Sequence, residues 1–164
     1  MPHPIMPPVD SLIAKLAAAG IHVPPGRVRV DGYGDSPELS EQLIELIRSG
    51  PKRAGTSLHW GIEHDGDDMP AIGDIEIVIS HLEEPVLLTR LTRVEVKPFC
   101  DVDAEYAAIE GEGDGSLDYW REGHWAFFSR ECARIGREPD ERRQPRARHA
   151  ARAHAGAPQG VRQA

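Results

Sequence analysis

Two runs of alternating apolar residues constrain the fold of this chain most strongly. Apolar residues alternate over residues 75–79, and after a turn at residues 83–85 a longer run covers residues 86–96. Period-two alternation between turn residues predicts β-strands. The alternation of the second run changes phase between Leu91 and Val94, as a β-bulge or a bend around a barrel would cause. We therefore expect two strands joined by a turn, the second of them irregular.

A capped helix is expected before these strands, from Pro37 to Ser49. Ser36 can cap its first turn, Pro37 suits the first helical position, and Gly50 can end it. Other elements are expected along the chain: a helix over residues 11–19, a short strand over 28–30, a basic turn from Pro51 that leads into a strand ending at Trp60, an acidic loop over 63–70, and a helical or turn-like segment over 102–109.

The stretch from Glu110 to Glu131 differs from an ordinary packing helix. It reads EGEGDGSLDYWREGHWAFFSRE, an acidic glycine-rich loop followed by a helix that Asp114 or Ser116 could cap. Two of the three Trp and two of the three Phe of the chain lie in it. Large flat side chains beside polar groups suit a site that binds something planar and polar. The alternative, that every aromatic ring belongs to the core, has about equal weight.

Charge is spread unevenly along the chain. The formal net charge is −8, yet all the acids lie at or before Glu141, and six Arg follow it. The end of the chain therefore carries about +6 and the rest about −14. An acidic body is a poor start for a nucleic-acid binder, although a local basic groove remains possible. The composition of residues 139–164 predicts a disordered basic tail, because it offers almost no apolar surface to bury.

Several classes of site and compartment lack support in the sequence. The two Cys form no CxxC pair, the first residues (MPHPIMPP) lack the charged-then-apolar pattern of a secretory leader, and no apolar run approaches the length that spans a membrane. A cytoplasmic protein with reduced thiols and no membrane partner is expected. The His residues are scattered and no nucleotide-binding fingerprint occurs, so we expect no metal and no cofactor. The oligomeric state is open.

Four segments together resemble the ASCH domain family, whose fold is related to PUA domains. They cover roughly residues 32–136 and read YGDSPELSEQLIELIRSGPKRAGTSLHW, AIGDIEIVI, RVEVKPFCDVDAEYAAIEGEGDGSLDYW and REGHWAFFSREC. The resemblance implies an α+β fold, a small PUA-like β-barrel with flanking helices, and RNA binding in a cleft between barrel and helices. It also implies two possible activities, ribonuclease in some members and amidohydrolase on acetylated cytidine in a distant branch. The expected layout is an N-terminal appendage over residues 1–31, the ASCH domain over 32–138 and the tail over 139–164.

The chain departs from the family pattern in two places. Members usually end with a hydrophobic strand, whereas this chain continues as ERRQPRARHAARAHAGAPQGVRQA, which a frameshift in a GC-rich gene would produce. Loss of that strand would expose a sheet edge. The amidohydrolase branch has Thr three residues after its Lys, whereas here Gly55 holds that position and Thr56 follows. The second departure weakens the transfer of hydrolase chemistry.

The basic turn carries the first set of candidate residues. By resemblance, Lys52 would contact a phosphate or act as a base, and Arg53 would make a second phosphate contact. The alternative is a solvated Lys after a helix C-terminus, where cations are favourable. Thr56 could supply a hydroxyl nucleophile, although such residues more often serve as plain hydrogen-bonding groups. Glu112, nearest the family's acidic position, is preferred to Glu110 as an acid or base.

The aromatic helix carries the second set. Trp120 and His124 share a face because they are four residues apart, whereas Trp125 lies about 100° from His124. Trp120 or Trp125 could stack on a base, with His124 beside them. Ser129 matches a family Ser that could act in nuclease chemistry. Three functions result: RNA binding with metal-independent ribonuclease activity through Ser129 and Glu112, amide hydrolysis on a modified nucleoside, or RNA binding without catalysis.

Overall fold

The fold was analysed in a computed structural model that describes residues 6–142 and 147–154. The helices are α1 (Val9–Ala18), α2 (Pro37–Ser49), α3 (His59–Asp65), α4 (Ala104–Glu110) and α5 (Leu117–Arg134), with a 3-10 turn at Phe99–Asp101. The strands are β1 (Val28–Gly32), β2 (Ile75–Ile79), β3 (Pro85–Lys97) and β4 (Ala147–His154). In the part of the chain that is described, no helix is both long and apolar enough to cross a membrane.

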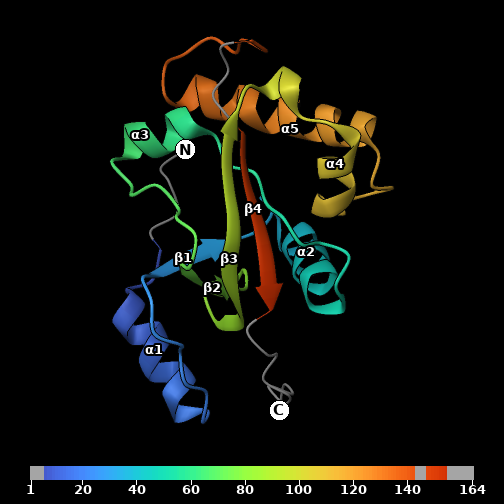
Figure 1. Ribbon diagram of the computed structural model, residues 1–164. Coiled ribbons are helices and arrows are strands. Elements are labelled where there is room, and N and C mark those ends of the chain that lie inside the picture. Colours follow the sequence, from blue (N-terminus) through green and yellow to red (C-terminus); the bar gives the residue numbers. More distant parts are fainter. Residues whose placement is uncertain (1–5, 143–146, 155–164) are drawn as a thin grey trace.

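The described strands form one open sheet in the order β1-β2-β3-β4 (Figure 1). β1 runs parallel to β2, and the other neighbours are antiparallel. The α+β class is confirmed, but the expected barrel is wrong for these residues, because β1 and β4 do not pair and the sheet keeps two edges. The predicted irregularity of β3 is confirmed: its register with β4 shifts between Leu91 and Arg93.

β2 is the buried centre of the sheet, and all five of its residues are buried. On one face, Ile75 and Ile77 pack with Leu12 and Leu16 of α1. On the other face, Val78 packs in a separate cluster, which is completed by residues of α2 and by Leu87 and lies across the sheet from α1. The N-terminal segment expected as an appendage is thus part of the core, since α1 covers the sheet and β1 extends it.

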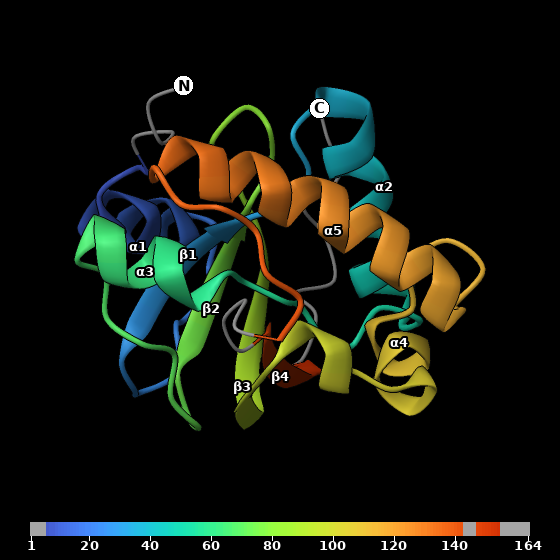
Figure 2. The same ribbon diagram turned by 90° about the horizontal axis from the view of Figure 1, so that it is seen from above.

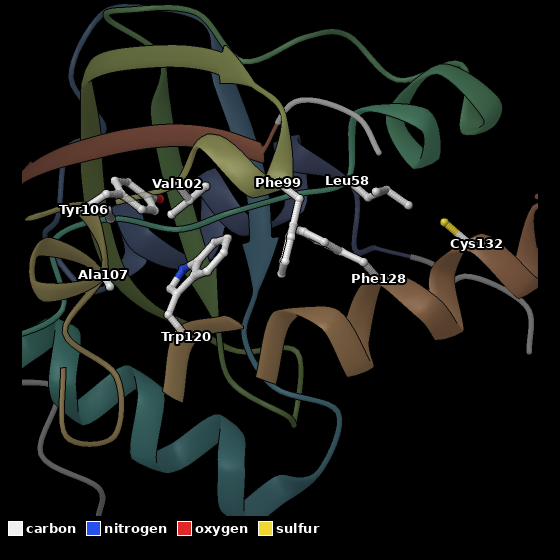
Figure 3. Packing of buried hydrophobic residues seen from close by; sticks show 9 residues of the cluster. Leu58, Phe99, Val102, Tyr106, Ala107, Trp120, Phe128 and Cys132 are labelled. Atoms are coloured by element: carbon white, nitrogen blue, oxygen red, sulfur yellow. The ribbon is translucent and has the colours of Figure 1, made fainter. Parts of the chain in front are cut away.

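A third cluster fixes α4 and α5 against the segment that follows β3 (Figure 3). Phe99 stands at its centre, with its ring centroid 5.3 Å from that of Trp120, 5.4 Å from that of Trp125 and 6.2 Å from that of Phe128. Aromatic pairs at such separations add to the apolar area they bury. Trp120 and Phe128 are therefore core residues, and the aromatic helix is held rigidly along one side.

Local capping follows the sequence closely at two helices. Ser36 Oγ accepts a hydrogen bond from the Leu39 backbone at 3.2 Å, and α2 ends at Gly50, whose φ is 105°. Ser116, rather than Asp114, caps α5 and accepts from the Tyr119 backbone. Both caps satisfy backbone groups that a helix end leaves unpaired.

The strand expected to end at Trp60 is wrong, because residues 52–58 form neither strand nor helix and α3 begins at His59. Leu58 precedes the helix as a buried residue, and Gly66 ends it with φ 71°. Asp65 at the end of α3 pairs with the Arg134 guanidinium of α5 at 2.8 Å. Packing against α5 therefore selects a short helix where the local sequence favoured a strand.

Within the tail that was expected to be disordered, two segments have described positions. Residues 139–142 lie against the domain, and β4 pairs with β3 from Thr89 to Lys97. Backbone hydrogen bonds require no apolar side chains, so a strand poor in apolar residues can still cover a sheet edge. The other tail residues, 143–146 and 155–164, lie outside the described part of the chain.

Candidate functional site

Four ionisable side chains from separate segments meet beneath the glycine-rich loop. They are Lys52, which follows α2, Glu110 at the end of α4, Glu112 in the loop, and His124 on α5, and we call them the Lys52 network. The backbone brings the segments together: the amide of Arg53 donates to the carbonyl of Ile109 at 3.0 Å. This backbone hydrogen bond aligns the chain after α2 with the end of α4.

Lys52 is surrounded by acceptors. Its Nζ donates to the Ala54 carbonyl at 2.9 Å, to Glu112 Oε1 at 2.5 Å and to Glu110 Oε1 at 3.4 Å. The centroid of the Tyr33 ring lies 5.5 Å from Nζ. The side chain is only 1% exposed. These contacts suit the ammonium form, so Lys52 is better placed to hold an anion than to remove a proton.

Glu110 is the buried acceptor at the centre of the network. Its Oε2 accepts from Thr56 Oγ1 at 2.8 Å and from Trp120 Nε1, and its Oε1 faces Lys52 and His124. Burial alone would raise the pKa of this carboxyl group. The positive charges of Lys52 and His124 outweigh burial, so the pKa of Glu110 lies far below its usual range. Glu110 is therefore a stable carboxylate and a weak base.

His124 has an acceptor at each ring nitrogen. Nδ1 lies 2.9 Å from the Trp120 carbonyl, and Nε2 lies 3.2 Å from Glu110 Oε1. Both nitrogens can donate only when the ring is an imidazolium. Burial would lower the pKa of His124, but the negative charge of Glu110 and the hydrogen bond to it raise the pKa above its ordinary value.

The resulting charges balance. Two cations, Lys52 and His124, face two carboxylates, Glu110 and Glu112, so the buried network carries no net charge. Such compensation is what makes buried ions tolerable. The network can hold and orient an anion at Lys52, whereas it contains no neutral base that is ready to take a proton.

Two hydroxyl groups extend the network. Thr56 Oγ1 lies 2.9 Å from Tyr106 Oη, which in turn lies 3.0 Å from the Gly55 carbonyl. With the Thr56–Glu110 contact, three close contacts share two hydroxyl protons, so they cannot all be hydrogen bonds at once. Thr56 and Lys52 therefore lie in one site, which the hydrolase hypothesis needs.

The remaining candidates lie apart from the network or play other roles in it. Trp120 is 3% exposed and its ring stacks on His124 with centroids 4.3 Å apart, so its faces are not accessible to a base. Arg53 is exposed beside the network. Trp125 faces a different pocket. Within the described residues, no hydrogen bond joins Ser129 to the network.

Glu110 was the residue that sequence reasoning undervalued. Glu112 was preferred because of its place in the family pattern, whereas Glu110 contacts more of the network. A signal was present: Tyr106 and Glu110 are four residues apart, so they share a helix face. Since an aromatic residue on a short helix usually faces the core, Glu110 had to face it as well.

Replacing His124 with Gln tests whether the His124 ring is charged in the folded protein. Because the folded pKa of His124 is raised, its stabilising contribution is complete below the unfolded value near 6.5 and is lost as pH rises through the folded pKa. We expect the variant to lose about 1.5–3 kcal/mol of unfolding free energy at low pH and less at high pH. Urea unfolding across pH measures this. Exposed His64→Gln is the control, and a difference that does not vary with pH would contradict the charged state.

Comparison with known proteins places this geometry in a family. A family model described as the ASCH domain matches residues 30–144. The crystal structure of an ASCH domain from Lactobacillus crispatus JV V101 is similar, with a TM-score of 0.76 and 26% identity over 94% of this chain and 98% of that one. A structure of an Enterococcus faecalis V583 protein has a TM-score of 0.70 and 24% identity, covering 87% of this chain and 83% of that one. Among curated proteins, no relative matches.

Proposed function

Since the chain belongs to the ASCH domain family, we propose that it binds RNA where the Lys52 network meets the surface. The proposal concerns binding rather than cleavage. Lys52 and His124 are held as cations and Glu110 is a weak base, so nothing in the network is prepared to activate a 2′-hydroxyl. Ribonuclease activity through Ser129 and Glu112 finds no support in their positions.

The contact between Glu112 and Lys52 is the observation that supports the proposal most. A carboxylate oxygen lies 2.5 Å from the ammonium, and the Glu112 side chain is 23% exposed while Lys52 is 1% exposed. Carboxylate and phosphate oxygens are equivalent acceptors for an ammonium group. A backbone phosphate could therefore take the place of Glu112 if the glycine-rich loop moves aside.

Arg53 supplies the second contact in this proposal. Its backbone is fixed by the hydrogen bond to Ile109, while its side chain is exposed next to Lys52. A fixed backbone with a solvent-exposed guanidinium suits phosphate contact, because little chain entropy is lost on binding.

RNA binding can be measured by fluorescence anisotropy with labelled single-stranded RNA over a salt series. We expect Arg53→Ala to weaken binding several-fold and to reduce the salt slope by about one. Arg48→Ala removes an exposed Arg that pairs with Glu45 on α2 and serves as the matched control. The same RNA, incubated in EDTA and run on a denaturing gel, is expected to stay intact.

The Arg-rich end of the chain needs its own control in that experiment. Six Arg follow Glu141 and would attract RNA without specificity. In a full-length variant with these six Arg changed to Gln, Arg53→Ala should still weaken RNA binding. Binding that disappears with the six Arg, while Arg53→Ala equals the parent protein, would overturn the proposal.

A second function, amide hydrolysis on a modified nucleoside, is favoured by one contact. Thr56 Oγ1 donates to Glu110 at 2.8 Å, and Lys52 lies in the same site. In a hydrolase, Thr56 would be the hydroxyl nucleophile, Glu110 would accept its proton and Lys52 would stabilise the oxyanion. Acetylcytidine turnover that is lost in Thr56→Val and kept in Ser57→Ala would establish it. Because Glu110 is a weak base, this function ranks second to RNA binding.

A further inference from the structure

A pocket outside the Lys52 network lies between α3 and α5. Trp60 of α3 and Trp125 of α5 line it, together with residues 137–142, and its volume is about 790 Å³. We call it the Trp60–Trp125 pocket. Ligand pockets in proteins commonly have volumes of roughly 300–1,000 Å³. The pocket is largely open to solvent, so a nucleobase would lie on its surface rather than be enclosed.

The outer wall of this pocket is a short segment tied at both ends. The amide of Arg137 donates to the Cys132 carbonyl at 2.9 Å, and the amide of Cys100 donates to the Glu141 carbonyl at 3.2 Å. Figure 2 shows this segment leaving α5 and running back between α3 and α5. The pocket is therefore formed by backbone contacts and does not depend on a ligand to shape it.

The floor of the pocket is aromatic and rigid. Both indoles are partly buried and pack against the same core cluster as Phe99, and the Trp125 and Phe99 rings are 5.4 Å apart. The Arg137 guanidinium lies over the Trp60 ring, 4.6 Å from its centroid, so Trp125 is the indole proposed to stack with a ligand. Aromatic rings held in this way can stack with a planar ligand at little cost in side-chain entropy.

The charges of the wall indicate which kind of ligand fits the pocket. Residues 137–142 carry two Arg and three acids, so the wall is slightly negative. A phosphate gains little there, whereas carboxylates accept hydrogen bonds from the amino groups of bases. A planar group with amino donors fits better than an anion.

We propose that the Trp60–Trp125 pocket binds an unpaired nucleobase with an exocyclic amino group by stacking on an indole ring. The inference deepens the proposed RNA binding: the Lys52 network would hold the phosphate backbone and this pocket would hold a base. The base could come from RNA or from a free nucleotide. A base-directed pocket predicts binding that depends weakly on salt, in contrast to the contact at Arg53.

The test titrates the full-length protein with AMP, UMP, a single-stranded RNA of alternating cytosine and adenine, and oligouridylate. Anisotropy reports on the RNAs, and calorimetry reports on the mononucleotides. Trp125→Leu should weaken binding of the cytosine–adenine RNA at least about fivefold, and Trp125→Phe should restore most of it. Phe127→Leu removes a half-exposed ring of α5 outside the pocket and should change nothing. Thermal unfolding confirms that each variant is folded.

The outcomes separate this inference from the proposed function. RNA binding that falls in Trp125→Leu and favours cytosine and adenine over uridine supports both. RNA binding that is equal in all Trp125 variants, or indifferent to base, overturns the pocket and leaves the RNA proposal. AMP binding that requires Trp125, without RNA binding, keeps the pocket as a nucleotide site and removes the RNA proposal. Absence of any binding removes both.

Discussion

Lys52→Met is expected to reduce the free energy of unfolding by about 3–5 kcal/mol. Lys52 and Glu110 are 1% and 2% exposed. Among the described residues, removing the ammonium leaves this buried carboxylate with one cation, His124, within contact distance. Methionine retains the length and the apolar stem, so the loss comes from charge rather than from a cavity. Urea unfolding at neutral pH measures the change.

A matched control separates burial from charge. Lys15→Met removes an ion pair with Glu84 whose side chains are 50% and 56% exposed, and exposed pairs contribute about 0.2–1 kcal/mol. The double variant Lys52→Met with Glu110→Gln should be less destabilised than the two single changes added together, because each removes the partner that the other would leave unpaired. Lys52→Met behaving like Lys15→Met would show that the network does not stabilise the fold.

The network shows what a sequence can predict about a site. Lys52, Thr56 and Glu112 were expected near one another, and the structure brings them together around Glu110. His124 was expected to face a ligand, whereas it serves as a buried counterion. Periodicity tells which residues share a helix face, but it does not tell whether that face meets solvent or another charged segment.

Two other differences have a common physical origin in tertiary contact. α3 is tied to α5 by the ion pair between Asp65 and Arg134, and no local propensity records that contact. β4 forms beside β3 although its composition resembles a disordered tail, because an open strand offers backbone groups to any partner. In each case the deciding neighbour is distant in sequence.

Gly111→Ala is expected to be the most damaging change in the glycine-rich loop, at about 3 kcal/mol or more. Gly111 has φ 66°, and a Cβ there would lie 2.1 Å from the Pro51 carbonyl oxygen, a backbone atom that cannot move without Lys52. Gly115 has φ 73° with no atom within 4 Å of its Cβ, so Gly115→Ala carries only the left-handed penalty of about 1–2 kcal/mol. Both variants pay the penalty of a left-handed backbone, and only Gly111→Ala adds a clash between the new Cβ and Pro51.

Gly113→Ala should fall between them, which makes the ranking a test of what anchors the network. A Cβ at Gly113 would meet the Tyr119 ring at 2.3 Å, but that side chain is 49% exposed and can rotate away. Chemical denaturation of the three variants gives the order. Equal losses at Gly111 and Gly115 would show that the loop does not rest on Pro51. A larger loss at Gly111 would mean that its backbone contact with Pro51 fixes the positions of Glu110 and Glu112 relative to Lys52. In that case, only the part of the loop after Gly111 is free to move when Glu112 gives up its place to a phosphate.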